Sequence, residues 1–476
     1  KTYAAAHKSV IGGTMTPVYW FRSLKNAGME EHYRELTAAE NRAGIEFQKA
    51  KTYMEELAER TGYSTWDPNE LHEVTLGGRK AKMTTEQLMT LYAVWRREHT
   101  ANPEMSEHLA KGGIYFKEQG TKGRERENTR PYRVTDAEVA AAYGQLTDGQ
   151  KEYIQGVVDF LSKDMAKLGN EASMRMYGIR KFKESYYFPM RVWRGVLGQK
   201  SSAGVNAGQD DNRIAHQSQT KRRKSGASNA LEIGNFTEIA AQHIVGQINY
   251  FTMAPVIENM NRVMNYRMTE GETEEEQTQR TVRAMFTENY GKEATDYMNR
   301  FLQDLNGGTV SEKSGLIREK LLSVFKKNAV AGSFSVAAQQ PLSYIRAAMM
   351  INPKYLAEAL ALEHTKNAYN ERMKWSGVSV IKDMGRFDMG YGQSAREYIT
   401  PEGKKSLLST AGEKIGEYST ILPEKMDAWT WNRMWVACKL EQKAQNPGMD
   451  TSSDEFMQKV AERFNELIRR AQVYDS

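Results

Sequence analysis

Apolar residues recur at helical spacing over a long segment near the start of the chain. Between Met29 and Leu57 they stand three or four residues apart, which predicts an amphipathic helix packed as a coiled coil or in a bundle. A shorter helix is expected before it, starting at Pro17, because proline suits the first helical position. The predicted inward stripe of the long helix is Met29, Tyr33, Leu36, Ala39, Ala43, Phe47, Ala50, Met54 and Leu57.

Three threonines, each followed three residues later by Gln or Glu, mark further helix starts. Such a pair can form a capping box, in which each residue's side chain accepts the other's backbone N–H. Each of them precedes a run with helical apolar spacing. The pairs are Thr84 with Gln87, Thr135 with Glu138 and Thr147 with Gln150, and the helices they predict cover 85–99, 136–145 and 148–168.

Two short hairpins are expected among these helices. Gly77-Gly78 separates the segments 72–76 and 79–83, which is the turn chemistry of a tight hairpin. The segments 114–116 and 132–134 are expected to pair as a second small hairpin around a basic loop.

Helical periodicity resumes at Phe236 and continues through the second half of the chain. Asn352-Pro353 begins one of these helices, and Ser452 with Glu455 is the predicted capping box of the last. Around Trp431 and Trp435, apolar residues occupy two faces of one helix, which predicts an enclosed position. Other expected helices cover 236–251, 256–264 and 282–305.

The chain of 476 residues is longer than one hydrophobic core usually serves. Large apolar residues are nearly absent from 201–230, which indicates a loop or linker. We therefore predict a mainly α-helical protein of elongated multi-helix bundle lobes with one or two small β-hairpins. Because it begins at Lys1 and not at Met, we expect a segment of a longer protein. The expected parts are an N-terminal helical lobe with small hairpins at 1–190, a basic flexible loop or linker at 191–232 and a C-terminal helical bundle at 233–476.

Positive charge is concentrated in two stretches of the chain. The net charge is +6, yet residues 171–232 alone hold 12 Lys and Arg against 5 Asp and Glu, and residues 111–133 are also basic. A cationic tetrad with arginines and Trp193 nearby could neutralise phosphates and stack on a base. The alternative is a solvated surface loop. The candidate nucleic-acid-binding residues are Lys221, Arg222, Arg223, Lys224, Arg191 and Arg194.

Motifs for catalysis or metal binding are absent from the sequence. It contains no P-loop, no GxGxxG, no HExxH and no GxSxG. Cys438 is the single cysteine and is expected to be a buried structural thiol, and His243 is expected to be a core histidine. We therefore expect no cofactor, no metal and no catalysis. An active site assembled from scattered residues stays open as an alternative.

One uncharged run raises the question of a membrane. Residues 328–345 carry no charge, but polar side chains and Pro341 interrupt the run. A spanning helix needs about 20 predominantly apolar residues, so we expect a core helix of small residues. Insertion into a bilayer under some conditions stays open, because small residues allow close helix packing.

Six short stretches stand in order along residues 140–476. They are 146–151 (LTDGQK), 169–174 (GNEASM) with Tyr177-Gly178, 186–191 (YYFPMR), 339–344 (QQPLSY), 435–441 (WVACKLE) and 471–476 (AQVYDS). Together they resemble a helical segment of the very large polyvalent proteins of bacteriophages and mobile elements from gut Firmicutes. The stretch 201–230 has no counterpart in this resemblance.

The resemblance implies a chain that is packaged in or delivered with phage particles, beside helicase, methyltransferase or nuclease modules. The first hypothesis is therefore a segment of a phage-related structural or internal (ejected) virion protein, an assembly and delivery element that associates with itself or with other virion proteins. The alternative is a nucleic-acid-binding accessory module of a larger phage replication, transcription or defence-evasion enzyme, which contacts DNA through the basic loop. The expected location is the virion or the bacterial host cytoplasm, and membrane contact is not favoured.

Overall fold

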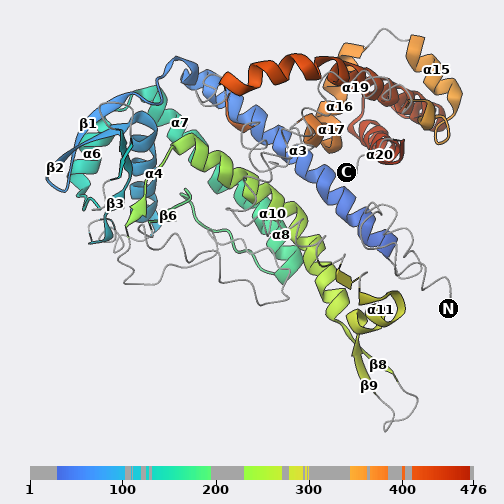
Figure 1. The fold of residues 1–476 in the computed structure, drawn as a ribbon, viewed down its shortest axis with the longest axis horizontal. Helices are drawn as coiled ribbons and strands as arrows, with labels where there is room; N and C mark the ends of the chain where they lie inside the picture. Colours follow the sequence, from blue (N-terminus) through green and yellow to red (C-terminus); the bar gives the residue numbers. More distant parts are fainter. Residues whose placement is uncertain are drawn as a thin grey trace. The chain divides into compact units, whose positions relative to one another are not determined.

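The protein is mostly helical, with a few short strands, as the sequence predicts (Figure 1). The described residues hold three antiparallel hairpins and one three-stranded sheet, which is more β structure than the one or two hairpins expected. The computed structural model describes residues 29–101, 109, 111–119, 125–127, 131–193, 230–270, 278–292, 295–296, 299, 344–361, 365–383, 399–401 and 410–471.

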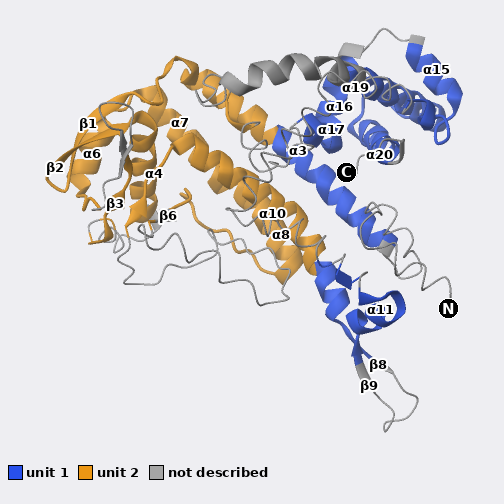
Figure 2. Ribbon diagram, in the orientation of Figure 1, with its two compact units in different colours: residues 1–48, 259–394, 405–476 blue, residues 49–258, 395–404 orange. Residues whose placement is uncertain are grey.

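Two compact units make up the chain (Figure 2). Their borders fall inside two long helices, α3 (Met29–Thr61) and α10 (Phe236–Asn265). Residues 194–229 lie outside the described residues, so the expected linker at 191–232 stays a prediction. Unit 1 comprises residues 1–48, 259–394 and 405–476, and unit 2 comprises residues 49–258 and 395–404.

Helix α3 confirms the first periodic pattern. It runs for 33 residues, with acidic side chains in its first turn and Arg60 in its last, where both signs complement the helix dipole. The stripe from Leu36 to Leu57 is buried within this chain. The expected helix from Pro17 to Gly28 lies outside the described residues.

The hairpin of unit 2 also follows the prediction. Strands β1 (Leu71–Leu76) and β2 (Arg79–Thr84) pair antiparallel around Gly77 and Gly78, whose φ angles are 58° and 71°. Positive φ at both turn positions favours glycine. A Cβ atom on Gly77 would also lie 2.5 Å from the Arg133 carbonyl oxygen.

All three predicted capping boxes of unit 2 are formed. Each threonine accepts the backbone N–H of the residue three positions later, and that residue's side chain accepts the threonine's N–H. The last helix continues past the predicted end at residue 168, through a π-helix at Phe160–Met165, and stops at Gly178 with φ 70°. The helices are α4 (Thr85–Ala101), α6 (Asp136–Gly144), α7 (Asp148–Asp159) and α8 (Ala166–Tyr177).

The second expected hairpin is only partly correct. Ile114 and Tyr132 exchange both backbone hydrogen bonds, at 2.7 and 2.8 Å, but form a single bridge. The pairing extends no further, because the next residues form another hairpin and Thr135 already caps α6. The strands of this region are β3 (Ile114–Tyr115), β4 (Lys117–Gln119), β5 (Glu125–Glu127), β6 (Arg191–Val192) and β7 (Leu231–Glu232).

Unit 1 is assembled from segments far apart in the sequence. The helices expected at 236–251 and 256–264 are in fact one helix, α10, which contains Pro255. Asn352 caps α15, as its position before Pro353 predicts. The elements that follow α10 are β8 (Arg267–Glu270), β9 (Thr278–Thr281), α11 (Val282–Tyr290), α15 (Pro353–Ala361), α16 (Thr365–Trp375), α17 (Gly377–Asp383), α19 (Thr410–Gln445) and α20 (Asp454–Ala471).

Helices α19 and α20 form the aromatic core of unit 1. The Phe464 ring lies edge-on to Trp431 and Trp435, with ring centroids 5.7 and 5.3 Å apart. Cys438 is fully buried, as predicted, and burial raises the pKa of its thiol. The predicted cap of α20 is wrong by one residue. Ser453, not Ser452, accepts the first-turn N–H, because Asp450 holds the Ser452 hydroxyl.

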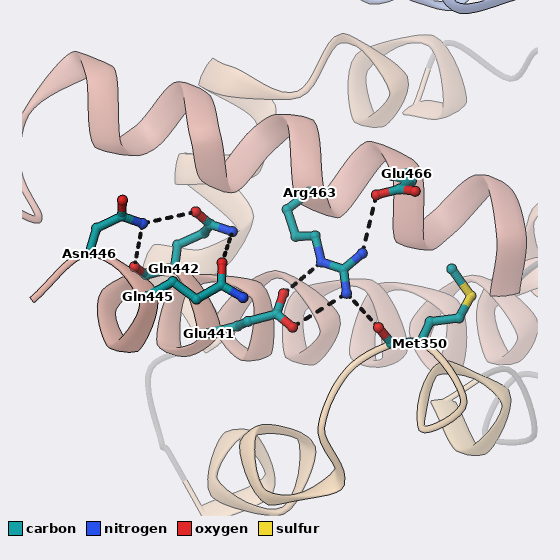
Figure 3. A network of polar contacts seen from close by, with 7 residues as sticks. All are labelled: Met350, Glu441, Gln442, Gln445, Asn446, Arg463 and Glu466. Atoms are coloured by element: carbon teal, nitrogen blue, oxygen red, sulfur yellow. Dashed lines mark hydrogen bonds and ion pairs between the residues drawn. The ribbon is translucent and has the colours of Figure 1, made fainter.

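An ion pair between the half-buried Arg463 and the buried Glu441 also joins α19 to α20 (Figure 3). The Arg463 guanidinium donates to Glu441 at 2.6 Å and to Glu466 at 3.2 Å, and it also donates to the Met350 carbonyl oxygen. The hydrogen bond to Glu441 is the main reason that the pKa of Arg463 is raised. The loop before α15 is thereby tied to both helices.

Within unit 1, the backbones of α3 and α17 lie in direct contact where the two helices cross. A Cβ atom on Gly377 would lie 1.8 Å from the Asn41 carbonyl oxygen, and one on Gly44 would lie 2.2 Å from the Gly377 carbonyl oxygen. No side chain fits between two backbones this close. Glycine is therefore required at both positions.

A buried network of hydrogen bonds joins the helices at this crossing. Asn41 Oδ1 accepts the Gly377 N–H at 2.7 Å and the Asn465 amide at 2.8 Å. Asn465 Oδ1 in turn accepts a hydrogen bond from the Ser376 hydroxyl at 2.6 Å. The Ser376 Oγ atom accepts the Ser379 N–H and so caps the start of α17. Three helices thus meet through satisfied polar groups, which is what burial demands.

Across the described ranges, no helix combines the length and the apolar character needed to cross a membrane. Of the uncharged run 328–345, only Tyr344 and Ile345 belong to these ranges. The expected core helix there stays a prediction.

The Gly377→Ala variant is expected to be destabilised by about 3 kcal/mol, because the new methyl group must displace backbone. Urea unfolding followed by circular dichroism measures this. Gly448→Ala is the matched control, since nothing lies within 4 Å of the added Cβ, and its effect should stay within about 0.5 kcal/mol. Equal stability of the two variants would contradict the close crossing.

Candidate nucleic-acid interface

The three-stranded sheet of unit 2 holds the two ends of the basic segment together. Strand β6 pairs antiparallel with β7, so that Arg191 lies opposite Glu232 and Val192 opposite Leu231. The Trp193 N–H then donates to the Ala230 carbonyl oxygen at 2.8 Å. Residues 194–229 therefore leave and re-enter unit 2 at one point of one sheet.

Of the predicted site residues, one lies in the described part of the chain. Arg191 belongs to β6, next to the exit point at Trp193. The others belong to the segment that the sheet closes, and their own positions lie outside the described residues. They are Arg194, Lys221, Arg222, Arg223 and Lys224.

The same sheet joins the second basic stretch. Strand β3 pairs with the other edge of β7 in parallel, through Leu231 N–H to Gly113 O at 3.0 Å and Ile233 N–H to Tyr115 O at 2.8 Å. The chain then turns into the β4–β5 hairpin, whose loop 120–124 includes Lys122 and Arg124. Two basic stretches about a hundred residues apart in sequence thus start from neighbouring strands.

An aromatic stack supports the exit point. The Trp193 indole lies against the Tyr115 ring, with centroids 4.7 Å apart and an angle of 20° between the planes. Tyr115 is buried and Trp193 is half-buried. One face of the indole is thus occupied by Tyr115, which fixes the ring next to the first residue of the basic segment.

Helix α4 anchors the chain after β7. The carboxylate of Glu86, in the first turn of α4, accepts the Thr237 N–H at 2.8 Å and the Thr237 hydroxyl at 2.9 Å. Thr237 is the second residue of α10, so a negative charge meets the positive end of that helix. Tyr63 donates to the same carboxylate at 3.4 Å.

Helix α4 also anchors the chain before β6. The buried Arg97 guanidinium donates to both oxygens of Glu184, at 3.0 and 3.1 Å, and to the Phe188 carbonyl oxygen at 2.7 Å. It also stacks on the Tyr187 ring, 4.4 Å from the centroid. Both flanks of the basic segment are therefore bonded to one rigid helix.

The π-helix between α7 and α8 provides another attachment for the chain before β6. Ser162, within it, accepts the Tyr187 N–H at 2.8 Å. Asn170 of α8 exchanges two hydrogen bonds with the backbone of Phe182, at 2.8 and 3.0 Å. The segment 178–193 lacks helix and strand over most of its length, yet its backbone is held by side chains.

Sequence reasoning did not identify Glu86, Arg97, Ser162 or Asn170. A glutamate in a first helical turn is ordinary, and an arginine in a helix usually faces solvent. Glu86 and Arg97 are distinguished only by their burial and by partners 151 and 87 residues away. No group of three or more His, Cys, Asp or Glu positioned for a metal ion is present within the part of the chain that the structure describes.

Burial is the largest influence on Glu86, and it raises the pKa of this carboxyl group despite its hydrogen bonds. The unfolded chain ionises near pH 4.3, before the folded chain does. The contribution of Glu86 to the free energy of unfolding is therefore largest below that pH. It decreases as the pH rises from the unfolded pKa toward the folded pKa.

Glu86→Gln should become more stable relative to the wild type as pH rises above about 4.3, because glutamine cannot ionise. The relative gain is about 1.4 kcal/mol for each pH unit between the unfolded and folded pKa values. Urea unfolding at pH 4, 5, 6 and 7 measures it. The control is Glu70→Gln, on an exposed glutamate. A difference that does not change with pH would show that Glu86 ionises normally.

No protein-family model, curated protein or solved structure matches this chain. The resemblance to phage polyvalent proteins therefore remains an expectation based on six short stretches of sequence. The contacts within unit 2 are the basis on which a function can be assigned.

Proposed function

We propose that unit 2 binds nucleic acid through two basic loops, residues 120–124 and 194–229. The observation that carries the proposal is the sheet β3–β7–β6. Residues 194–229 connect its strands β6 and β7, and β3 is followed in the chain by the β4–β5 pair that flanks 120–124. Exposed cations border it on the β3 side, at Lys111, Lys117 and Arg133. Phosphate backbones bind such clusters without regard to sequence.

The bonds from α4 to both flanks of residues 194–229 support a role for the two basic segments in one binding surface. Glu86 and Arg97 attach both flanks of 194–229 to α4, so the two ends of this segment are held at the sheet before a ligand arrives. Confinement lowers the entropy that binding must overcome. The indole of Trp193, fixed on Tyr115, adds an aromatic group beside the first cations, which suits single strands.

The proposed setting is an accessory module of a larger phage-related enzyme of replication, transcription or defence evasion. Its place would be the virion or the cytoplasm of the bacterial host. The sequence resemblance supports this setting, and the concentrated charge supports DNA as the partner.

Replacing Lys221, Arg222, Arg223 and Lys224 by Ala should weaken binding to single- and double-stranded DNA and flatten its salt dependence. For double-stranded DNA the slope of log K against log salt should fall by ~0.9 for each phosphate that the variant no longer neutralises. Fluorescence anisotropy from 50 to 300 mM salt measures the slope.

A matched control removes four exposed cations from unit 1, by alanine substitution of Arg346, Lys354, Lys374 and Lys443. It changes the net charge equally, so its slope should stay close to that of the wild type. An unchanged slope in the tetrad variant, or equal changes in both variants, would overturn the proposal.

A structural role in assembly is the second proposal. What favours it is a set of large apolar side chains exposed on one stretch of unit 1, with Met349 82%, Ile345 65% and Leu360 48% exposed. Exposed apolar side chains of this size can mark a contact with another molecule. A second copy of the chain, or another virion protein, would be that molecule.

This second role predicts self-association that depends on these side chains. Light scattering across protein concentration should show oligomers for the wild type and a shift toward monomer for the double variant Ile345→Gln, Met349→Gln. The control is Leu71→Gln, at an exposed leucine of unit 2. A monomer at every concentration would remove the assembly role and leave nucleic-acid binding untouched.

A further inference from the structure

Helix α8 of unit 2 ends in a group of exposed apolar side chains and cations, residues 174–183, which we call the α8-end cluster. Its large apolar residues lie open to solvent, with Ile179 56%, Met174 46% and Tyr177 45% exposed. Exposed cations stand between and after them, and one further cation is half-buried. The exposed cations are Arg175, Arg180 and Lys183, and the half-buried one is Lys181.

No carboxylate neutralises these four cations within the part of unit 2 that the structure describes. Glu184 is the one acidic residue between 174 and 190, and it is bonded to Arg97. Glu171, one turn before Arg175 in α8, forms no ion pair with any of the four. Partial burial lowers the pKa of the Lys181 ammonium group, whereas a nearby carboxylate would raise it. Positive charge concentrated in this way attracts polyanions.

The chain after α8 folds back onto the helix, so the cluster has a fixed backbone. Gly178, with φ 70°, ends the helix, and its N–H donates to the Met174 carbonyl oxygen at 2.9 Å. The Asn170 side chain donates to the Phe182 carbonyl oxygen at 2.8 Å and accepts the Phe182 N–H at 3.0 Å. Residues 178–182 are therefore held against α8 at both ends.

Tyr177 is fixed within this cluster. The Lys181 ammonium lies 3.2 Å from the centroid of its ring, and its hydroxyl shares a hydrogen bond with Tyr250 of α10. The tyrosine stays 45% exposed despite both contacts. An exposed aromatic ring beside cations is a combination that binds single-stranded nucleic acid, because bases stack on the ring while phosphates meet the cations.

Two kinds of anionic surface attract such a cluster, a nucleic acid and a membrane. A membrane would draw on the exposed apolar side chains of Met174 and Ile179. Nucleic acid is favoured by the fixed ring of Tyr177 and by the chain that follows. Residues 184–193 lead from the cluster, past the bonds of Arg97 to Glu184 and the Phe188 carbonyl oxygen, to the start of the basic segment 194–229.

We propose that the α8-end cluster is a further contact for single-stranded nucleic acid. Tyr177 stacks on a base, and Arg175, Arg180 and Lys183 contact phosphates. The inference rests on the function proposed for unit 2. It adds a second binding surface to that function and specifies the single strand as the partner.

The test is fluorescence anisotropy of the full chain with a single-stranded oligodeoxynucleotide and with the corresponding duplex. Tyr177→Leu keeps an apolar side chain but removes the ring, so it should bind the single strand about tenfold more weakly and the duplex as the wild type does. Tyr177→Phe keeps the ring and is the matched control, with wild-type affinity for both.

The cations are tested by the double variant Arg180→Gln, Lys183→Gln. The slope of log K against log salt for the single strand should fall by ~0.7 for each phosphate contact that is lost. The control is Arg346→Gln, Lys374→Gln, which removes two exposed cations from unit 1 and should leave the slope unchanged.

The outcomes separate this contact from the function on which it rests. Wild-type affinity in Tyr177→Leu and an unchanged slope in Arg180→Gln, Lys183→Gln, with binding still weakened by the Lys221–Lys224 alanine variant, would overturn the contact alone. A wild type that binds no DNA would overturn the proposed function. Met174→Gln, Ile179→Gln should leave binding to vesicles of phosphatidylcholine and phosphatidylserine unchanged. Loss of vesicle binding in this variant, with DNA binding intact in Tyr177→Leu, would assign the cluster to a membrane.

Discussion

A buried charge must meet an opposite charge or a dipole, and helix α4 of unit 2 is built around this requirement. Glu86 at its start meets the N-terminus of α10, and Arg97 near its end meets Glu184 and the Phe188 carbonyl group. Removing Glu184 would leave the Arg97 charge without its carboxylate, and removing Thr237 would leave the Glu86 carboxyl group without two of its hydrogen bonds. These two sets of bonds therefore fix the chain on both sides of residues 194–229, whose flanking strands β6 and β7 pair in the sheet β3–β7–β6.

The same requirement organises much of unit 1. Glu40 pairs with Arg469 and Glu441 pairs with Arg463, while the crossing of Gly44 and Gly377 is closed by amide and hydroxyl groups that satisfy one another. Arg372 donates to the Asn432 amide oxygen, lies near the Tyr369 ring and is attracted by the Asp383 carboxylate.

Local patterns in the sequence predicted the parts of the fold that local chemistry controls. Capping threonines, the Gly77-Gly78 turn and the apolar stripe of α3 each act over a few residues, and all are found where expected. Long-range pairings could not be predicted this way. The parallel pairing of β3 with β7 joins two-residue strands 117 positions apart, too short for any periodicity. Arg372 likewise looks like an ordinary helical arginine until its burial is known. The positive charge of the basic segment could be predicted from the sequence. The pairing of its two flanking strands, β6 and β7, could not.

The central claim is that two basic stretches, distant in sequence, form one nucleic-acid-binding surface because one sheet holds them together. Hydrogen–deuterium exchange of the full chain, with and without a DNA oligonucleotide, tests it most directly. The account predicts that DNA slows exchange in both 117–127 and 194–229, at the same DNA concentration. Protection of one stretch without the other, or protection confined to unit 1, would contradict it.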